Sequence, residues 1–76
     1  MSRPEKHSLT LRRHRTSVSL EPEFWMAFIA LATRRGLGLN ALAVEIDEAR
    51  TTGTGLATAI RLAVLADLTA QKPELP

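Results

Sequence analysis

Along residues 15–20 of this 76-residue chain, polar side chains alternate with a second set that is mostly apolar. One face of the extended segment carries the polar set, Arg15, Ser17 and Ser19. The opposite face carries Thr16, Val18 and Leu20. This period of two predicts a half-buried β-strand. A pair of such strands presents guanidinium and hydroxyl groups on a surface whose size and polarity fit the major groove of DNA.

No set of residues in the sequence has the spacing of a catalytic or metal-binding site. There is no cysteine, no nucleophile beside a base and no phosphate-binding loop, so we expect no enzyme, no cofactor and no metal. His7 and His14 are expected to be surface residues and not ligands. The acidic residues Glu45, Asp47 and Glu48 scatter around a helix, which favours a solvated face over a catalytic set.

The net charge of +2 conceals a strong asymmetry along the chain. Residues 1–16 hold a single acid, Glu5, beside five basic residues: Arg3, Lys6, Arg12, Arg13 and Arg15. Two copies would therefore gather a large positive charge on one side, as expected for a polyanion partner. We expect Arg12 and Arg13 to meet DNA phosphates. A membrane surface is disfavoured, because the basic segment lacks a helical lipid-facing stripe.

A lone strand cannot satisfy its own backbone hydrogen bonds, so the strand needs a partner. The simplest partner is the same strand of a second copy, which predicts one strand per chain and an intermolecular ribbon. A hairpin within one chain is disfavoured, because its turn would fall in residues 12–14, which contain no Gly, Asn or Pro. Residues 1–13 are then a flexible basic arm, although Leu9 to Leu11 could extend the ribbon.

Three helices follow the strand. The first begins at Pro22 and ends before Gly36, the second runs from about Leu39 to Ala49, and the third from about Leu56 to Ala70. Their expected buried stripes comprise Phe24, Trp25, Phe28, Leu31 and Ala32; Leu39, Leu42, Ile46 and Ala49; and Ala59, Ile60, Ala63, Val64 and Leu68. Residues 14–71 form the expected domain, and residues 72–76 a C-terminal tail. So short a chain is marginally stable alone, which favours a homodimer.

The segment Arg-Thr-Ser-Val-Ser-Leu followed by Glu-Pro-Glu-Phe-Trp resembles the ribbon-helix-helix family of small DNA-binding repressors. The turn Arg-Gly-Leu-Gly-Leu-Asn and the helix opening with Ala41 and Leu42 belong to the same likeness, which covers roughly residues 14–68. More narrowly, the chain resembles a subgroup with an interrupted helical half. The family's fold is an intertwined homodimer, mainly α, whose paired strands form an antiparallel ribbon.

The resemblance implies a role for particular residues. Arg15, Ser17 and Ser19 would contact bases in the major groove of double-stranded DNA. The amides of Leu39 and Asn40, at the start of the second helix, would grip a phosphate, as free N–H groups at a helix N-terminus can. Gly38 stands where relatives usually have a Ser or Thr cap, so a looser grip is expected.

The sequence therefore predicts a sequence-specific DNA-binding transcriptional repressor acting in the cytoplasm. There is no apolar run long enough to span a membrane. The alternative is a protein-interaction module, such as an antitoxin or phage adaptor, whose helical half binds another protein.

Overall fold

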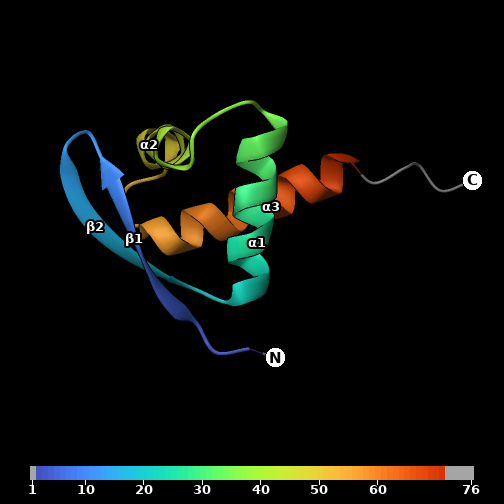
Figure 1. The fold of residues 1–76 in the computed structure, drawn as a ribbon, viewed down its shortest axis with the longest axis horizontal. Helices are drawn as coiled ribbons and strands as arrows, with labels where there is room; N and C mark the ends of the chain where they lie inside the picture. Colours follow the sequence, from blue (N-terminus) through green and yellow to red (C-terminus); the bar gives the residue numbers. More distant parts are fainter. Residues whose placement is uncertain (1, 72–76) are drawn as a thin grey trace, which may run out of the picture.

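The computed structural model describes residues 2–71, which form a two-stranded hairpin against three helices (Figure 1). The elements in chain order are β1 (Glu5–Leu11), β2 (His14–Leu20), α1 (Pro22–Arg34), α2 (Leu39–Ala49) and α3 (Leu56–Gln71). The hairpin lies along one side of the helices, and α1 crosses α3 in the view of Figure 1. Expected helix bounds agree with the structure to within one residue.

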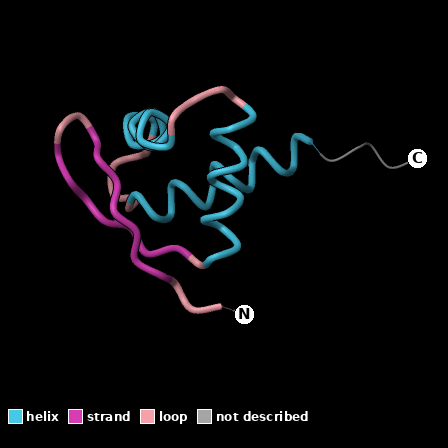
Figure 2. Tube along the Cα trace, viewed as in Figure 1, coloured by secondary structure: helices cyan, strands magenta, loops and turns pink. Residues whose placement is uncertain are grey.

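A hairpin forms within one chain, which corrects the expectation of a single strand per chain. β1 and β2 are antiparallel, with Leu11 opposite His14 and Glu5 opposite Leu20. Arg12 and Arg13 alone join them (Figure 2), with φ angles of 48° and 72°. Two consecutive residues at positive φ are what a type I′ hairpin turn requires, and Gly or Asn usually supplies them.

The expectation was wrong because it considered only the local preferences of the turn residues. A left-handed conformation costs about 1–2 kcal/mol for each residue with a side chain. Here seven paired residues per strand and a buried inner face offset that local cost. The turn therefore forms because strand pairing and burial stabilise it, although the conformational preferences of its two arginines disfavour it.

β1 lies in the segment that was expected to be a separate basic arm. Leu9, at the centre of β1, is 2% exposed and belongs to the hydrophobic core. Leu11 packs against that core, so the segment from Leu9 to Leu11 does extend the ribbon. The expected tail, residues 72–76, lies outside the described residues.

Both boundaries of α1 follow from local sequence. Pro22 occupies the first turn of α1 and Glu23 faces the positive end of its dipole. Gly36, at φ 68°, ends α1: its N–H donates to the carbonyl of Thr33, and the N–H of Leu37 donates to the carbonyl of Ala32. This pair of bonds is a Schellman motif, which positive φ at glycine permits.

The core lies between the hairpin and the helices. Its largest fully buried side chains are Phe28, Leu20, Leu42, Ile60 and Val64. Two expected core residues are exposed instead, namely Ala49 and Leu68, the latter at 52%. Leu68 is exposed because the C-terminal half of α3 extends past α1, as Figure 1 shows.

Among the described helices, none is by itself long and apolar enough to cross a membrane. α1 and α2 together have sufficient length and apolar character, but they are bent by 101° at the break between them.

Candidate nucleic-acid interface

Both strands contribute to the polar outer face of the ribbon. The register places Arg15 opposite Thr10, Ser17 opposite Ser8 and Ser19 opposite Lys6, and all six side chains are exposed. The structure therefore places the three expected base-contacting residues of β2 together on one solvent-facing surface. It also adds three residues from β1 that sequence reasoning missed.

The missed residues have a signal in the sequence. Ser8 and Thr10 alternate with Leu9 and Leu11, as Ser17 and Ser19 alternate with Val18 and Leu20. That pattern predicts a second strand. The interpretation of this segment as an arm rested on the turn residues and not on the pattern.

The outer face of the ribbon has a fixed position because the inner face packs on the helices. Leu9, Val18 and Leu20 are buried, and β2 packs on α1 and α3. His7, also on the inner face, stacks on Trp25 with ring centroids 3.8 Å apart and planes 4° from parallel. His7 is half-buried, and its Nε2 has no hydrogen-bond partner, so the expectation of a surface residue was wrong. His14 is exposed, as expected.

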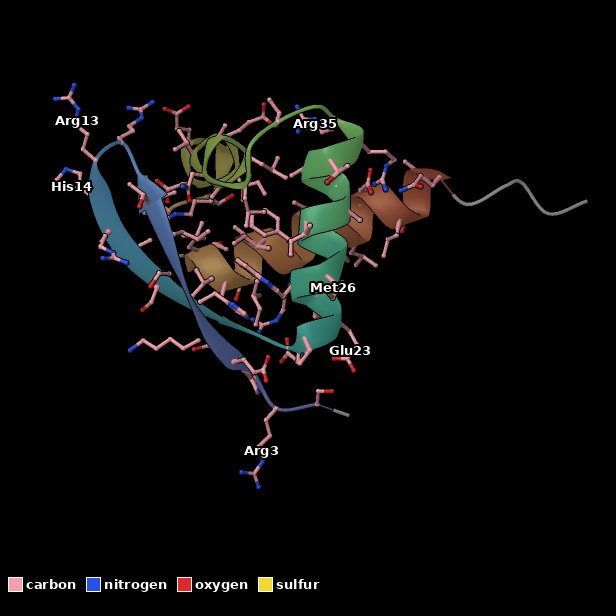
Figure 3. The ribbon with its side chains drawn as sticks, in the orientation of Figure 1. Arg3, Arg13, His14, Glu23, Met26 and Arg35 are labelled. Carbon is pink, nitrogen blue, oxygen red and sulfur yellow. The ribbon has the colours of Figure 1, made fainter. Side chains whose placement is uncertain are left out.

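The turn carries the basic side chains that were expected to meet phosphates. Arg13 and His14 project from this end of the ribbon, away from the helices (Figure 3). Arg12 pairs with Glu48 of α2. Arg13 has no ion pair within residues 2–71, so the two turn arginines differ in their availability to a ligand.

The start of α2 lies beside the ribbon. Gly38 is the N-cap and gives no side-chain hydrogen bond, which leaves the first amides of the helix, including those of Leu39 and Asn40, without a side-chain cap. Asn40 Oδ1 accepts a hydrogen bond of 3.0 Å from the backbone N–H of Thr10. This bond fixes the positive end of α2 next to the edge of β1.

Ion pairs neutralise the described arginines of the helical half and leave most basic residues of the N-terminal half unpaired. All four described arginines of the helical half face an acid: Arg34 with Asp67, Arg35 with Glu45, Arg50 with Asp47 and Arg61 with Glu21. Within residues 2–71, the cations without a salt bridge are Arg3, Lys6, Arg13 and Arg15, all in residues 3–15. The described cations that are free to meet an anion are thus on the ribbon and the residues just before it.

Arg61 joins α3 to the junction between β2 and α1. Its Nε donates to Glu21 Oε1 at 2.9 Å, and its Nη2 donates to the carbonyl of Ser19 at 3.1 Å. The guanidinium also lies 5.8 Å from the ring centroid of Phe24. The hydrogen bond from Arg61 is the main reason that the pKa of Glu21 lies below its ordinary value.

A second ion pair ties α1 to α2. Hydrogen bonding between Arg35 and Glu45 lowers the pKa of Glu45 and raises that of Arg35. Glu45, Asp47 and Glu48 each pair with a different arginine: Glu45 links α2 to the end of α1, Asp47 pairs with Arg50 just after α2, and Glu48 links α2 to the turn of the hairpin. In the described part of the chain, no three His, Cys, Asp or Glu residues gather as a metal site would need.

Comparison with known families agrees with this geometry. The family described as ribbon-helix-helix domain matches residues 4–68, most of the chain, including β1 and most of α3. The chain belongs to the ribbon-helix-helix family. Domains of this family are typically non-enzymatic transcription regulators that bind DNA, generally as dimers. No curated protein and no solved structure was found to match the chain.

Proposed function

We propose that this ribbon-helix-helix protein is a sequence-specific transcriptional repressor that inserts the outer face of its ribbon into the major groove of double-stranded DNA. The observation that carries the proposal is the division of charge described above. Every described arginine of the helical half is paired, whereas Arg13, Arg15 and Lys6 on the ribbon are unpaired. A polyanion is therefore attracted to the polar face that can read base edges.

Each part of the ribbon has a distinct role in this proposal. Arg15 is long enough to donate two hydrogen bonds to guanine, and Ser17 and Ser19 are short enough to let the backbone approach the bases. Arg12, Arg13 and the amides of Leu39 and Asn40 hold phosphates at the rim of the groove. Because Asn40 is bonded to Thr10, the phosphate-binding end of α2 is held in register with the base-reading face.

We also propose that the protein acts as a homodimer, in keeping with its family. Action in the cytoplasm remains a prediction.

Selection from random duplexes, followed by affinity measurements on the selected site and on unrelated DNA, tests the proposal. Arg15→Ala should weaken binding to the selected site by about 1–3 kcal/mol and binding to unrelated DNA much less, because a base contact exists only at its own base. Arg35→Ala is the matched control, since it removes the same charge from the paired half of the molecule, far from Arg13 in Figure 3. Its affinity for both duplexes should stay close to that of the wild type.

Circular dichroism of Arg15→Ala checks that the fold is retained, as expected for an exposed side chain. Equal losses of affinity on both duplexes would mean that Arg15 contacts phosphate only. Failure of the wild type to bind duplex DNA at low salt would refute the proposed function.

A further inference from the structure

Arg61 of α3 contacts the chain on both sides of the point where β2 ends and α1 begins. On the β2 side, its Nη2 donates to the carbonyl of Ser19 at 3.1 Å. The same Nη2 lies 3.3 Å from Glu21 Oε2, and Nε lies 2.9 Å from Glu21 Oε1. On the α1 side, the guanidinium lies over the ring of Phe24. One side chain of α3 thus links the end of the ribbon to the first turn of α1.

At the joint between β2 and α1, the side chain of Glu21 bonds to α3 and not to α1. Glu21 is the single residue between Leu20, the end of β2, and Pro22, the start of α1. A side chain at this N-cap position commonly accepts a hydrogen bond from the first turn of its helix, but Glu21 makes no such bond within residues 2–71. Its carboxylate is bound to Arg61 instead. The backbone at the joint is therefore held by α3, in addition to the burial of Leu20.

The pair of Arg61 and Glu21 is the least exposed of the salt bridges in residues 2–71, with side chains that are 29% and 22% exposed. Salt screens such a shielded pair less than it screens an exposed one. A guanidinium that already binds a carboxylate and a carbonyl is also not among the cations free to meet a phosphate. We therefore expect Arg61 to act on the ribbon and not on DNA directly.

Ser19 is the proposed base-contacting residue that depends most on the backbone at this joint. Its hydroxyl is attached directly to Cβ, so Oγ moves with the backbone, whereas the long side chain of Arg15 can adjust through its own rotatable bonds. A hydrogen bond weakens steeply as it bends, and the groups of a binding site must be held to within about 0.5 Å. A shift of the backbone at Ser19 should therefore remove the contact of Ser19 with its base first.

We propose that Arg61 is a positioning residue for base recognition: it fixes the Ser19 carbonyl and Glu21, so that the Ser19 hydroxyl is held where it meets its base. The DNA half of this inference rests on the proposed function. A carbonyl oxygen can accept two hydrogen bonds, so the contact with Arg61 leaves the Ser19 carbonyl able to bond to a neighbouring strand in a dimer as well. Through Arg61, α3 contributes to the choice of DNA sequence without touching the DNA.

Arg61→Met removes the bonds to Ser19 and Glu21 and keeps most of the apolar stem that packs beside Phe24. Circular dichroism checks that this variant folds. If it does not, Arg61→Lys takes its place, because lysine keeps the charge beside Glu21 but cannot reproduce the fork of donors that also binds Ser19.

Arg50→Met is the matched control. Arg50 also bonds to a carboxylate, that of Asp47 at 2.7 Å, and to a backbone carbonyl, that of Thr54 at 2.6 Å. It lies at the C-terminal end of α2 and outside the ribbon. Arg50→Met and Arg61→Met lose the same charge and the same kinds of bond, so the two variants differ in the place of the lost contacts.

Hydrogen exchange of the free protein, followed by NMR, tests the positioning without DNA. In Arg61→Met, the amides of residues 18–21 should exchange about 2- to 10-fold faster than in the wild type, because a hydrogen bond that opposes local opening is lost. The same amides should exchange at wild-type rates in Arg50→Met. Unchanged exchange in Arg61→Met, or equal acceleration in both variants, would overturn the proposal.

Selection from random duplexes tests the effect on base recognition. Ser19→Ala identifies the base pair that Ser19 reads, as the position whose preference weakens in that variant. Arg61→Met should weaken the preference at the same position by about 2- to 10-fold, the loss of one hydrogen bond, and should leave other positions close to the wild type. Ser19→Ala/Arg61→Met should lose no more there than Ser19→Ala alone, because a positioning residue has no effect once the group that it positions is gone.

An additive loss in the double variant, or a loss spread over all positions, would overturn the role of Arg61 in base recognition. A salt slope that is shallower by about 0.9 in Arg61→Met than in Arg50→Met would also overturn it, because Arg61 would then contact a phosphate itself. If no preference weakens in Ser19→Ala, the base contact of Ser19 is wrong, and the DNA half of the inference with it. Failure of the wild type to bind duplex DNA refutes the proposed function, whereas the exchange rates still decide whether Arg61 positions Ser19.

Discussion

At the scale of single residues, the alternation along β2 determines which side chains face the core. Val18 and Leu20 are buried and Ser17 and Ser19 are exposed, as the sequence predicts. The stack of His7 on Trp25 was not predictable, because it depends on where β1 lies and hence on the turn. The sequence predicts the environment of a side chain when the periodicity of one element determines it. It does not predict an environment that depends on how two distant elements pack together.

The contact between Glu21 and Arg61 leads to a prediction about acid stability. Arg61 lowers the pKa of Glu21 in the folded protein, so folding is stabilised while Glu21 is ionised. This contribution is fully present above the ordinary pKa of 4.5 and is lost as the pH falls through the lower, folded value. Glu21→Gln should therefore be less stable than the wild type at pH 7, and the difference should shrink in acid.

Urea unfolding at a series of pH values measures this difference. Glu5→Gln is the control, since Glu5 makes no salt bridge within residues 2–71. A difference between Glu21→Gln and the wild type that stays constant from pH 7 to strong acid would mean that ionisation of Glu21 is not what stabilises the fold.

At the scale of elements, the three helices and the alternating pattern of both strands were predictable, and the turn that joins the strands was not. Pro22, Gly36 and the glycine-rich break after Arg50 mark helix boundaries through local backbone preferences, which a sequence displays directly. The turn at Arg12 and Arg13 opposes local preference, and only the pairing of β1 with β2 explains it. The burial of Leu68 was also wrongly expected, because a helical stripe does not show where the neighbouring helix ends.

The turn offers a way to stabilise the protein. Arg12→Asn/Arg13→Gly places an Asn-Gly pair where both φ angles are positive, which is the preferred type I′ sequence. The free energy of unfolding should rise by about 1 kcal/mol, because the left-handed penalty is relieved. The melting temperature should rise by about 4–8 °C for a domain of this size.

Arg12→Gln/Arg13→Gln is the control for that experiment, because it removes both charges and leaves the backbone strained. It should melt no higher than the wild type. If the Asn-Gly variant showed no gain over this control, or melted lower, then the two strands would not be joined by this turn in solution.

At the scale of the whole molecule, the pairing of charges separates a basic ribbon from a neutralised helical body. Family membership supports DNA binding in general, and our proposal that the ribbon performs it is based on the distribution of unpaired cations within residues 2–71. Sequence alone located the positive charge in residues 1–16. It could not show that the arginines of the helical half are paired, because most of those pairs connect different elements.

The salt dependence of DNA binding reports how many phosphates the protein neutralises. Each phosphate contact that releases a counterion contributes about 0.9 to the slope of log affinity against log salt. Arg12→Gln/Arg13→Gln should therefore make the slope shallower by roughly 0.9 through Arg13, which has no ion pair within residues 2–71, and by more where a phosphate displaces Glu48 from Arg12. Arg34→Gln/Arg35→Gln removes the same charge from arginines paired with Asp67 and Glu45, and should leave the slope nearly unchanged. Equal changes in both variants would mean that net charge, and not binding of phosphate at the turn, controls nonspecific affinity, and would remove Arg12 and Arg13 from the interface.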